Sequence, residues 1–491
     1  MAGHNSDYEL KSVNVTEQAK PPLPSAHDVS SEEDTAHVQT RTRRLFSLNK
    51  LFAFHLNYMG TWYGVGGNMY FAMYNGGPSA WFFGYLIIFF FACFQVASFA
   101  ELSSIQPIAG AQYYWTYHFA PPTPLLEALV QINYSDYEQT GWRTMLITLA
   151  VLSAMTFVNL YCFRVVPFVE LITGILSLIL FLAFVVIYLV MGPRNSVDIF
   201  TTSGTLSGWE DFYASSHVGA LSSFFLFIGF EGVINMGEES KTAQVVVPKS
   251  LLWSVVTGGL MGFIFSIVLM FVIPSPEVLI AAANPQIATM LHVTGSIKAT
   301  TAMGSFYLFL QWSSAMCTIS SASRLTWAWA RDGGLPQYFG HVDGKYRIPL
   351  RAVSLNSVII ALLSLLNLGS GAFVALGAIS SLATTALYIN AIILAVVLYA
   401  RFTSGFKLGE WNLGKWGAPI NVIALVYTIY AVIWFPWPQT VPVDGSTLNY
   451  SGPVTGLVLV AAVTLWFMKS RHHWEGPSRA VAKIVLENAK K

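Results

Sequence analysis

Residues 60–68 read Gly60-Thr61-Trp62-Tyr63-Gly64-Val65-Gly66-Gly67-Asn68 and lie inside an apolar stretch that covers residues 51–75. Four glycines in eight positions make a poor helix, because each glycine costs about 1 kcal/mol relative to alanine. Irregular backbone at membrane depth is tolerated only where it is buried in protein or lines a cavity. The stretch therefore predicts an interrupted membrane helix with a binding site at the interruption.

A second interruption is predicted at Ile228-Gly229-Phe230-Glu231-Gly232, within the apolar span near residues 214–236. Paired interruptions in corresponding segments of two halves point to the binding site of a secondary transporter. The alternative is that these glycines serve only close packing between helices. A dinucleotide-binding loop is excluded, because no strand and no βαβ unit accompany the glycines.

The composition is that of a polytopic membrane protein. Of 491 residues, 54% are hydrophobic and only 10% are charged, whereas an average soluble domain has roughly 25% charged residues. A soluble fold of this size could not cover its surface with so few charges. A soluble enzyme, a nucleic-acid binder and a disordered protein are therefore excluded. Cys93, Cys162 and Cys317 lie in apolar runs, so neither a disulfide framework nor a metal site is predicted, and no cofactor is expected.

Charge-free apolar stretches of about 20 residues predict membrane helices. Eleven such stretches occur, near residues 51–75, 79–100, 144–162, 166–191, 214–236, 250–273, 300–323, 352–367, 371–400, 418–436 and 452–468. Residues 1–50 are predicted to be a disordered cytoplasmic tail, residues 51–468 the transmembrane domain and residues 469–491 a cytoplasmic C-terminal tail.

The distribution of basic residues predicts a twelfth crossing. With a cytoplasmic N terminus and eleven crossings, most of the 26 Lys and Arg residues fall outside. One more crossing before Arg143 leaves only Arg143, Arg194 and Lys298 outside. Yet the best apolar piece there, residues 119–132, contains prolines and is too short to cross roughly 30 Å of hydrocarbon. Either a re-entrant or interfacial loop occupies this interval, or the chain has lost a third helix.

Glu231 is the candidate for proton coupling, because it lies in the middle of an otherwise charge-free span. A charge at the bilayer centre costs about 2.5–3.5 kcal/mol on insertion scales, so it needs a partner, a proton or a watery cavity. Glu231 can carry the coupling proton or oppose a substrate ammonium, or else remain neutral and hydrogen-bonded to broken-helix amides. Glu170 is expected to be solvated or structural, and Glu101 interfacial.

The predicted substrate-binding residues flank the two interruptions. They are Trp62, Tyr63, Gly64, Gly66, Gly67, Asn68, Phe227, Gly229, Phe230, Glu231 and Gly232. The rings of Trp62, Tyr63, Phe227 and Phe230 are predicted to form one aromatic wall. Each ring of such a wall would attract a cationic substrate by about 0.5–2 kcal/mol. Ser313, Ser314 and Ser320 are further candidates, although serine in a membrane helix often bonds its own backbone. The sequons at Asn133 and Asn449 predict N-glycosylation in outer loops, with Asn449 the better acceptor.

Three strings on the cytoplasmic side carry a family resemblance. They are Ala100-Glu101-Leu102-Ser103-Ser104, Glu238-Glu239-Ser240 and Ala330-Arg331-Asp332-Gly333-Gly334-Leu335-Pro336. With them the chain resembles the amino acid–polyamine–organocation superfamily, in particular its fungal amino acid/choline permease branch, from about Leu51 to Trp474. The resemblance implies a five-plus-five inverted repeat of twelve helices, with the substrate at broken helices one and six. It also implies a third helix, for which no apolar stretch of membrane length is found between Leu102 and Arg143.

The sequence thus predicts an all-α permease that takes up a small amino acid or amine, such as γ-aminobutyrate or choline, by alternating access. Uptake is expected to be coupled to protons, with facilitative transport as the alternative. A transport-deficient truncated isoform or a nutrient sensor is the alternative. An enzyme is disfavoured, because the spans hold no cluster of metal ligands and no nucleophile–base set. The expected location is the plasma membrane, or else the vacuolar membrane, with both termini cytoplasmic. Arg324 and Arg331 are expected to pair with Glu238 or Glu239, or to form a solvated basic loop.

Overall fold

The computed structural model describes residues 42, 44–105, 123–134, 136–138, 140–282, 284–368, 389–403, 408–445 and 448–470. Within these ranges the chain is helical, and its β structure is limited to one isolated bridge between Phe46 and Ser240. The prediction of an all-α protein is confirmed. Most of the predicted N-terminal tail and nearly all of the predicted C-terminal tail lie outside the described residues.

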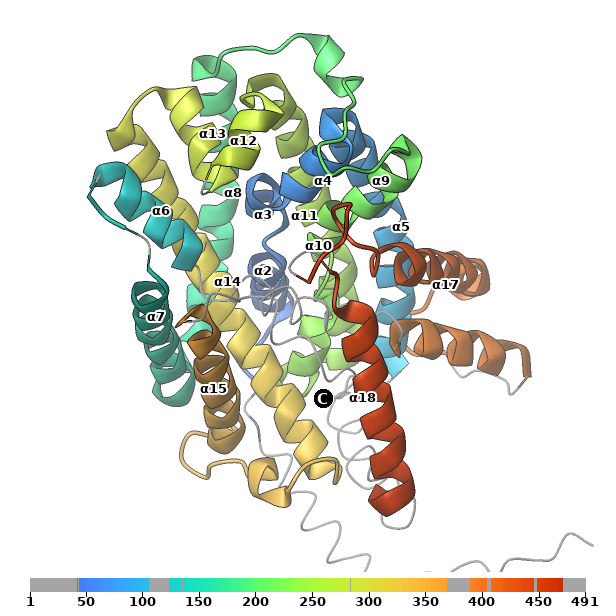
Figure 1. Ribbon diagram of the computed structural model, residues 1–491. Helices are drawn as coiled ribbons and strands as arrows, with labels where there is room; N and C mark the ends of the chain where they lie inside the picture. The colour runs from blue at the N-terminus through green and yellow to red at the C-terminus, as the bar shows by residue number, and fades with distance from the viewer. Residues whose placement is uncertain are drawn as a thin grey trace, which may run out of the picture.

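Figure 1 shows the arrangement of the helices. In chain order they are α2 (Leu48–Met59), α3 (Thr61–Asn68), α4 (Tyr70–Asn75), α5 (Gly77–Ile105), α6 (Thr123–Asn133), α7 (Gly141–Tyr161), α8 (Val166–Met191), α9 (Phe212–Gly219), α10 (Leu221–Phe225), the 3₁₀ helix η3 (Phe230–Glu239), α11 (Ala243–Val272), α12 (Pro276–Ala281), α13 (Pro285–Thr294), α14 (Ile297–Arg331), η4 (Gln337–Gly340), α15 (Leu350–Ser364), Ile389–Thr403, α17 (Gly417–Trp434) and α18 (Ser451–Leu465). Short turns η2 (Val197–Phe200), η5 (Leu365–Leu368), η6 (Gly414–Trp416) and η7 (Trp466–Ser470) complete the described elements.

Each predicted span coincides with helical residues, although the span near 371–400 is described only from residue 389 onward. Seven helical segments of the described chain are by themselves long and apolar enough to cross a membrane. They are Gly77–Ile105, Gly141–Tyr161, Val166–Met191, Phe212–Glu239, Ala243–Val272, Leu350–Leu368 and Gly414–Trp434. The protein is therefore a multi-pass membrane protein.

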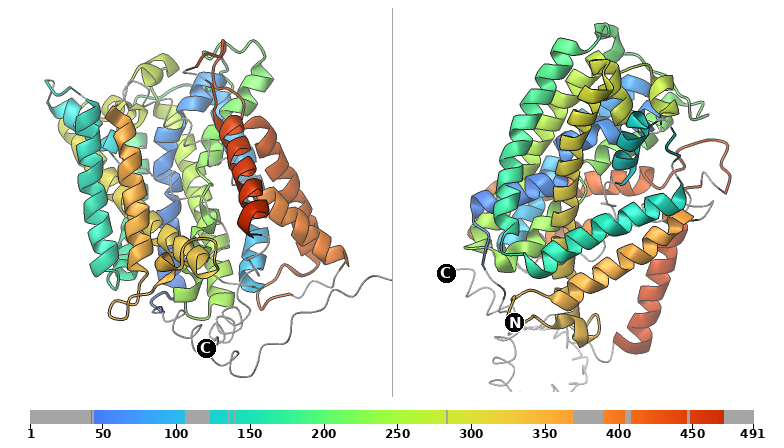
Figure 2. Two further views of the ribbon diagram at one scale, coloured as in Figure 1. Left: turned by 60° about the horizontal axis from the view of Figure 1, so that its bottom comes forward. Right: turned by 90° about the vertical axis from the view of Figure 1, so that its left-hand side faces the viewer.

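The interrupted helices lie at the centre of the bundle. α2 packs against α8, α11 and α14, while the pairs α7–α15 and α5–α17 lie to either side of it (Figures 1 and 2). The burial of the helices agrees with this arrangement. In Phe212–Glu239, 89% of the most apolar stretch is buried inside the protein, whereas in Gly141–Tyr161 the share is only 22%. The second predicted interruption therefore lies inside the protein, and α7 turns most of its surface outward.

The interval between Leu102 and Arg143, in which no membrane-spanning helix was predicted, contains α6, which has 11 residues. At 1.5 Å per residue α6 is about 16 Å long, roughly half the hydrocarbon thickness. Its Glu127 is buried and accepts a hydrogen bond from Thr144 Oγ1 at 2.7 Å. Residues 106–122 lie outside the described residues. α6 therefore cannot cross the membrane alone, and the loss of a third helix stays a prediction.

The first described helix begins before residue 51. α2 begins at Leu48, and Phe46 is completely buried. The Phe46 amide donates to the Glu239 carbonyl at 3.2 Å, and the Lys241 amide donates to the Phe46 carbonyl at 3.0 Å. These bonds hold the residues before α2 against the end of η3, and the predicted domain boundary at residue 50 stays a prediction.

Candidate functional site

The first helix is interrupted at Gly60, between α2 and α3. Gly60 has a φ of 58°, in the left-handed region that a side chain disfavours. A Cβ at this position would lie 2.5 Å from the Tyr63 ring. Position 60 therefore requires glycine for two reasons: its backbone is left-handed, and the Tyr63 ring of the next turn lies over the break.

The predicted unwinding of the rest of this glycine-rich string was wrong. Gly64, Gly66 and Gly67 all lie inside α3, which ends at Asn68. Asn68 Nδ2 donates to the Gly64 carbonyl at 3.0 Å, across one helical turn. Glycine helix propensity is a weak preference that tertiary packing overrides. The break is therefore confined to one residue.

Side chains satisfy the carbonyl groups that the break leaves free at the end of α2. The Tyr63 hydroxyl donates to the Asn57 carbonyl at 2.6 Å, and Ser314 Oγ donates to the Tyr58 carbonyl at 3.0 Å. The Gly60 amide donates to the Leu56 carbonyl at 3.2 Å. Ser314, considered as a substrate ligand, thus closes the end of a broken helix in this conformation.

The sixth helix is interrupted between α10 and η3. Gly229 has a φ of 84°, and η3 begins at the next residue. Thr61, the first residue of α3, donates from Oγ1 to the Leu226 carbonyl at 3.2 Å. A Cβ on Gly64 would lie 2.9 Å from the Leu226 side chain. The two predicted interruptions therefore touch each other.

Glu231 lies in the first turn of η3 and is 2% exposed. Neither of its carboxylate oxygens accepts a hydrogen bond from another residue in the described part of the chain. Its neighbour Gly232 lies under the Tyr58 ring, since a Cβ there would be 2.5 Å from that ring. Ser321 Oγ donates to the Gly232 carbonyl at 2.9 Å. The carboxyl group is thus held beside the helix-1 break without a partner, an arrangement that normally costs free energy.

Glu170 of α8 is also completely buried, so the expected solvated position was wrong. Its Oε2 accepts hydrogen bonds from Asn57 Nδ2 at 2.7 Å and from Ser313 Oγ at 2.7 Å. Asn57 Nδ2 also donates to the Glu170 carbonyl at 2.9 Å. Glu170 therefore connects α8 to α2 and α14, just below the Gly60 break. Only the structural part of the expectation holds.

The four rings predicted to form one wall belong to three separate groups. Trp62 makes an edge contact with Tyr63 at 5.6 Å between ring centres, and its Nε1 donates to Ser177 Oγ at 2.9 Å. Phe227 stacks on Phe89, with 5.6 Å between ring centres. Phe230 meets Phe99 edge-on, with 5.3 Å between ring centres. A single aromatic box made of all four rings is therefore not present in this conformation.

Buried ion pairs close the end of the bundle near Phe46. Arg324 Nε lies 2.8 Å from Glu239 Oε1, and Arg331 Nη1 lies 3.0 Å from Glu238 Oε2. All four side chains are nearly inaccessible, so the solvated basic loop was the wrong alternative. The Arg324 guanidinium also lies over the Phe163 ring, 3.9 Å from its centre.

Two further expectations can be compared with the structure. Glu101 is 1% exposed and pairs with Arg401, and its predicted position at the membrane interface stays a prediction. Ser320 Oγ donates to Asn159 Oδ1 at 2.6 Å, within the protein interior.

The two predicted glycosylation sites differ in exposure. Asn133 is exposed at the end of α6, and Asn449 is partly buried. The Asn449 amide donates to the carbonyl groups of Phe435 and Trp437 at 2.9 and 3.2 Å. The Asn133 amide likewise donates to the Leu129 carbonyl and to Thr301 Oγ1, at 2.9 and 2.7 Å. Only the greater exposure of Asn133 therefore favours that site. The use of either site stays a prediction.

Two interrupted helices that meet beside a buried carboxyl group define the class of secondary transporters with broken helices. Residues 125–460 match the family model described as amino acid permease. The chain belongs to this family of transporters, which are not enzymes, and the predicted superfamily is confirmed.

Named relatives align over most of the chain. A choline transporter of Saccharomyces cerevisiae is 23% identical over 95% of this chain and 88% of its own length. A GABA-specific permease of the same yeast is 24% identical over 93% of this chain and 87% of its own length. An amino-acid permease of Arabidopsis thaliana is 24% identical over 82% of this chain and 87% of its own length.

Proposed function

We propose that the protein takes up a small amino acid or amine, such as γ-aminobutyrate or choline, together with protons. The observation that carries the proposal is the buried carboxyl group of Glu231 at the contact between the two broken helices, which accepts no hydrogen bond from another described residue. A buried carboxyl group without a partner is stabilised by a bound proton or by a cation. The substrate class comes from the relatives, which include a choline transporter and a GABA-specific permease.

Glu231 can take either of two roles at this site. As the proton carrier, it would be neutral in one state and release its proton in another. As a counter-charge, it would face the substrate ammonium directly. In both roles the position of Glu231 in the first turn of η3 contributes, because the N-terminal end of a helix favours a negative charge.

The breaks also supply the movement that alternating access requires. Gly60 and Gly229 join short helices on either side of the site, and such positions absorb changes in backbone angle. The path toward the Phe46 end is closed by the ion pairs Arg324–Glu239 and Arg331–Glu238. Opening this side would require those pairs to separate, so we infer that the described conformation is closed toward that side.

We infer that this closed side is cytoplasmic and that both termini lie there, in the plasma membrane or alternatively the vacuolar membrane. The charge rule supports this orientation, because only Arg143, Arg194 and Lys298 would then lie outside. Exposed Lys298 and Lys241 offer a matched test in a background with the three native cysteines replaced by serine. In intact cells an impermeant maleimide should label Lys298→Cys but not Lys241→Cys. The reverse pattern would overturn the orientation.

The second candidate is a transport-deficient form or a nutrient sensor. It is favoured by α6, whose 11 residues stand where the family's third helix would cross. A chain without that helix would keep the broken helices but lose one wall of the substrate path.

Uptake by purified protein in phosphatidylcholine vesicles distinguishes the two candidates. The substrates are labelled γ-aminobutyrate, choline and a neutral amino acid. Uptake of each is measured with an acidic buffer outside the vesicles, and a protonophore serves as the control. We expect accumulation of one of them that the protonophore abolishes. A chimaera in which a relative's third helix replaces residues 106–122 forms the second arm. Accumulation only in the chimaera supports the transport-deficient form, and accumulation in neither refutes the proposed function.

A further inference from the structure

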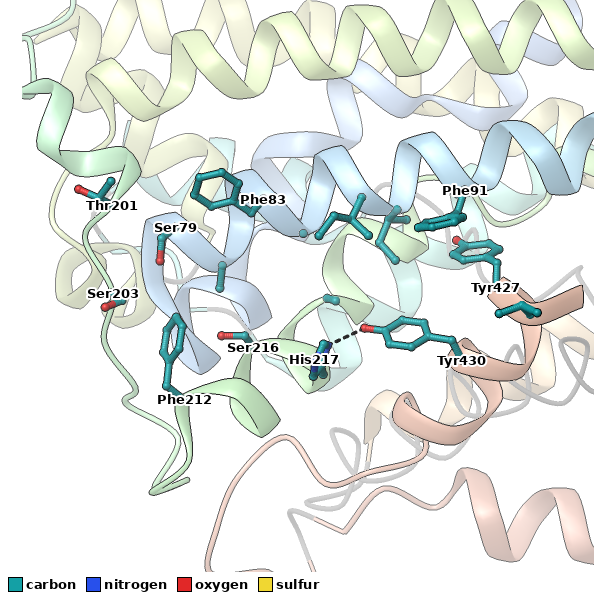
Figure 3. A pocket seen from close by; sticks show the side chains of 16 residues that line it. Ser79, Phe83, Phe91, Thr201, Ser203, Phe212, Ser216, His217, Tyr427 and Tyr430 are labelled. Atoms are coloured by element: carbon teal, nitrogen blue, oxygen red, sulfur yellow. Dashed lines mark hydrogen bonds between the residues drawn. The ribbon is translucent and has the colours of Figure 1, made fainter. Parts of the chain in front are cut away.

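A cavity of about 610 Å³ lies between α5, the start of helix six and α17 (Figure 3). Its volume falls within the range of small-molecule pockets. Phe83, Ile87 and Val426 line it and are 49%, 51% and 62% exposed. These three apolar residues lie on membrane-spanning helices, so the cavity opens sideways toward lipid. It is separate from the helix-break site, whose Glu231 does not line it.

Four hydroxyl side chains of the cavity gather at one end. Figure 3 shows Ser79, Thr201, Ser203 and Ser216 around Phe212 at that end. Thr201 and Ser203 belong to the connection between α8 and α9, which lies at the end of the bundle away from the buried ion pairs. The cavity therefore has a hydroxyl-rich end near the membrane boundary, while His217, Tyr427 and Tyr430 carry further polar groups toward its other end (Figure 3).

Buried hydroxyl groups in this cavity have no hydrogen-bond partner in the described residues. They are Ser79 Oγ, Ser216 Oγ and the Tyr427 hydroxyl, and the Ser79 and Tyr427 side chains are 8% and 3% exposed. An unsatisfied buried hydroxyl costs about 1–3 kcal/mol. Near Ser216, His217 Nδ1 and the Tyr430 hydroxyl lie 2.8 Å apart. The cavity thus offers a ligand hydrogen bonds from Ser79 and Ser216 at its hydroxyl-rich end and from the Tyr427 hydroxyl toward its other end.

We propose that this cavity binds a sterol from the surrounding bilayer. A sterol is a rigid, mostly apolar molecule with one hydroxyl group. That hydroxyl would lie at the membrane boundary and bond Ser79 or Ser216, while the fused rings would pack against the apolar walls of α5 and α17. No Lys, Arg, Asp or Glu lines the cavity among the described residues. A phospholipid phosphate would find no cation there, so a neutral amphiphile fits the lining better.

The test uses the full chain in phosphatidylcholine nanodiscs with a photoreactive sterol that carries a diazirine on its ring system. Gly84 lines the cavity, and a Cβ there would meet only atoms 3.8 Å or more away. Gly84→Leu should therefore fill the cavity without disturbing the fold. The matched control is Gly456→Leu on α18, an exposed position with no atom within 4 Å of a new Cβ.

We expect saturable labelling of peptides from α5 and α17, competed by unlabelled sterol. Gly84→Leu should abolish this labelling, and Gly456→Leu should leave it unchanged. Ser216→Ala should weaken sterol binding about three- to ten-fold, the value of one hydrogen bond. Equal labelling in Gly84→Leu and Gly456→Leu would overturn the proposal. Competition by phosphatidylglycerol as strong as competition by sterol would also overturn it, in favour of a phospholipid.

Discussion

Glu170 and Glu231 are two carboxyl groups that are almost equally buried near the last turn of α2, and they differ in their neighbours. Glu170 accepts hydrogen bonds from Asn57 and Ser313, whereas Glu231 accepts none from another described residue. Burial therefore does not separate a structural carboxyl group from a functional one. The number of bonds that each oxygen already makes is the more useful criterion, because a satisfied group has less to offer a proton or a substrate.

Glu239 is a third buried carboxyl group, and it differs from the other two because it forms an ion pair. Its Oε1 lies 2.8 Å from Arg324 Nε. Glu239→Ala would leave the Arg324 charge buried and unpaired, so we expect the largest loss of stability, about 3–5 kcal/mol. Reversible unfolding in mixed micelles measures it. Glu239→Ala together with Arg324→Leu serves as the control and should recover part of the loss. A single variant as stable as the parent would mean that the pair is open in the membrane.

Glu170→Ala should have the next largest effect. It removes the acceptor for two buried donors, Asn57 Nδ2 and Ser313 Oγ, at about 1–3 kcal/mol for each donor left unsatisfied. Glu170→Gln keeps one acceptor oxygen and should lose much less. The same unfolding measurement applied to Glu231→Ala should give a smaller loss than Glu170→Ala. The opposite order would break the distinction between the two sites.

The contact between the breaks can be tested with two glycines of equal φ. Gly60 and Gly295 both have a φ of 58°, but only at Gly60 would a Cβ meet another side chain, the Tyr63 ring. Gly295→Ala should cost about 1–2 kcal/mol for the left-handed backbone alone. Gly60→Ala should cost about 1–3 kcal/mol more, because of the clash. Equal losses would mean that Tyr63 does not close over the break.

The smallest expected effect concerns the glycines inside α3. A Cβ on Gly67 would come no closer than 3.7 Å to another residue's side chain. Gly67→Ala should therefore stabilise the protein by about 0.5–1 kcal/mol, as replacing glycine in a helix does. A destabilised variant would indicate that this segment is unwound in the folded protein, as the sequence had suggested.

Much of the fold could be predicted from the sequence, because charge-free apolar runs of membrane length have few alternatives. The positions of both interruptions also followed from glycine content. Their extent did not, because Gly64 and Gly67 are helical through contacts that propensity does not describe. The site residues that the sequence missed, Asn57 and Tyr58, carry no local signal. They matter because they occupy the last turn before Gly60.

The roles of the carboxyl groups were harder to predict than the helices. Glu170 and Glu101 looked peripheral because they lie near the ends of their spans, yet both are buried. Their partners, Ser313 and Arg401, are distant in sequence, and only the packing of the helices brings them together. The same holds for the aromatic residues, since Trp62 and Phe227 contact different helices.

Acid-driven uptake by Glu231→Gln and Glu170→Gln tests the central claim most directly, with Glu277→Gln as the surface control. The measurement uses the parent chain or the third-helix chimaera, whichever transports. Glu231→Gln should abolish accumulation driven by a pH gradient, because glutamine cannot carry the proton. Glu170→Gln and Glu277→Gln should retain it. Retained rate, pH dependence and substrate affinity in Glu231→Gln would contradict the account, and so would loss of coupling in Glu170→Gln alone.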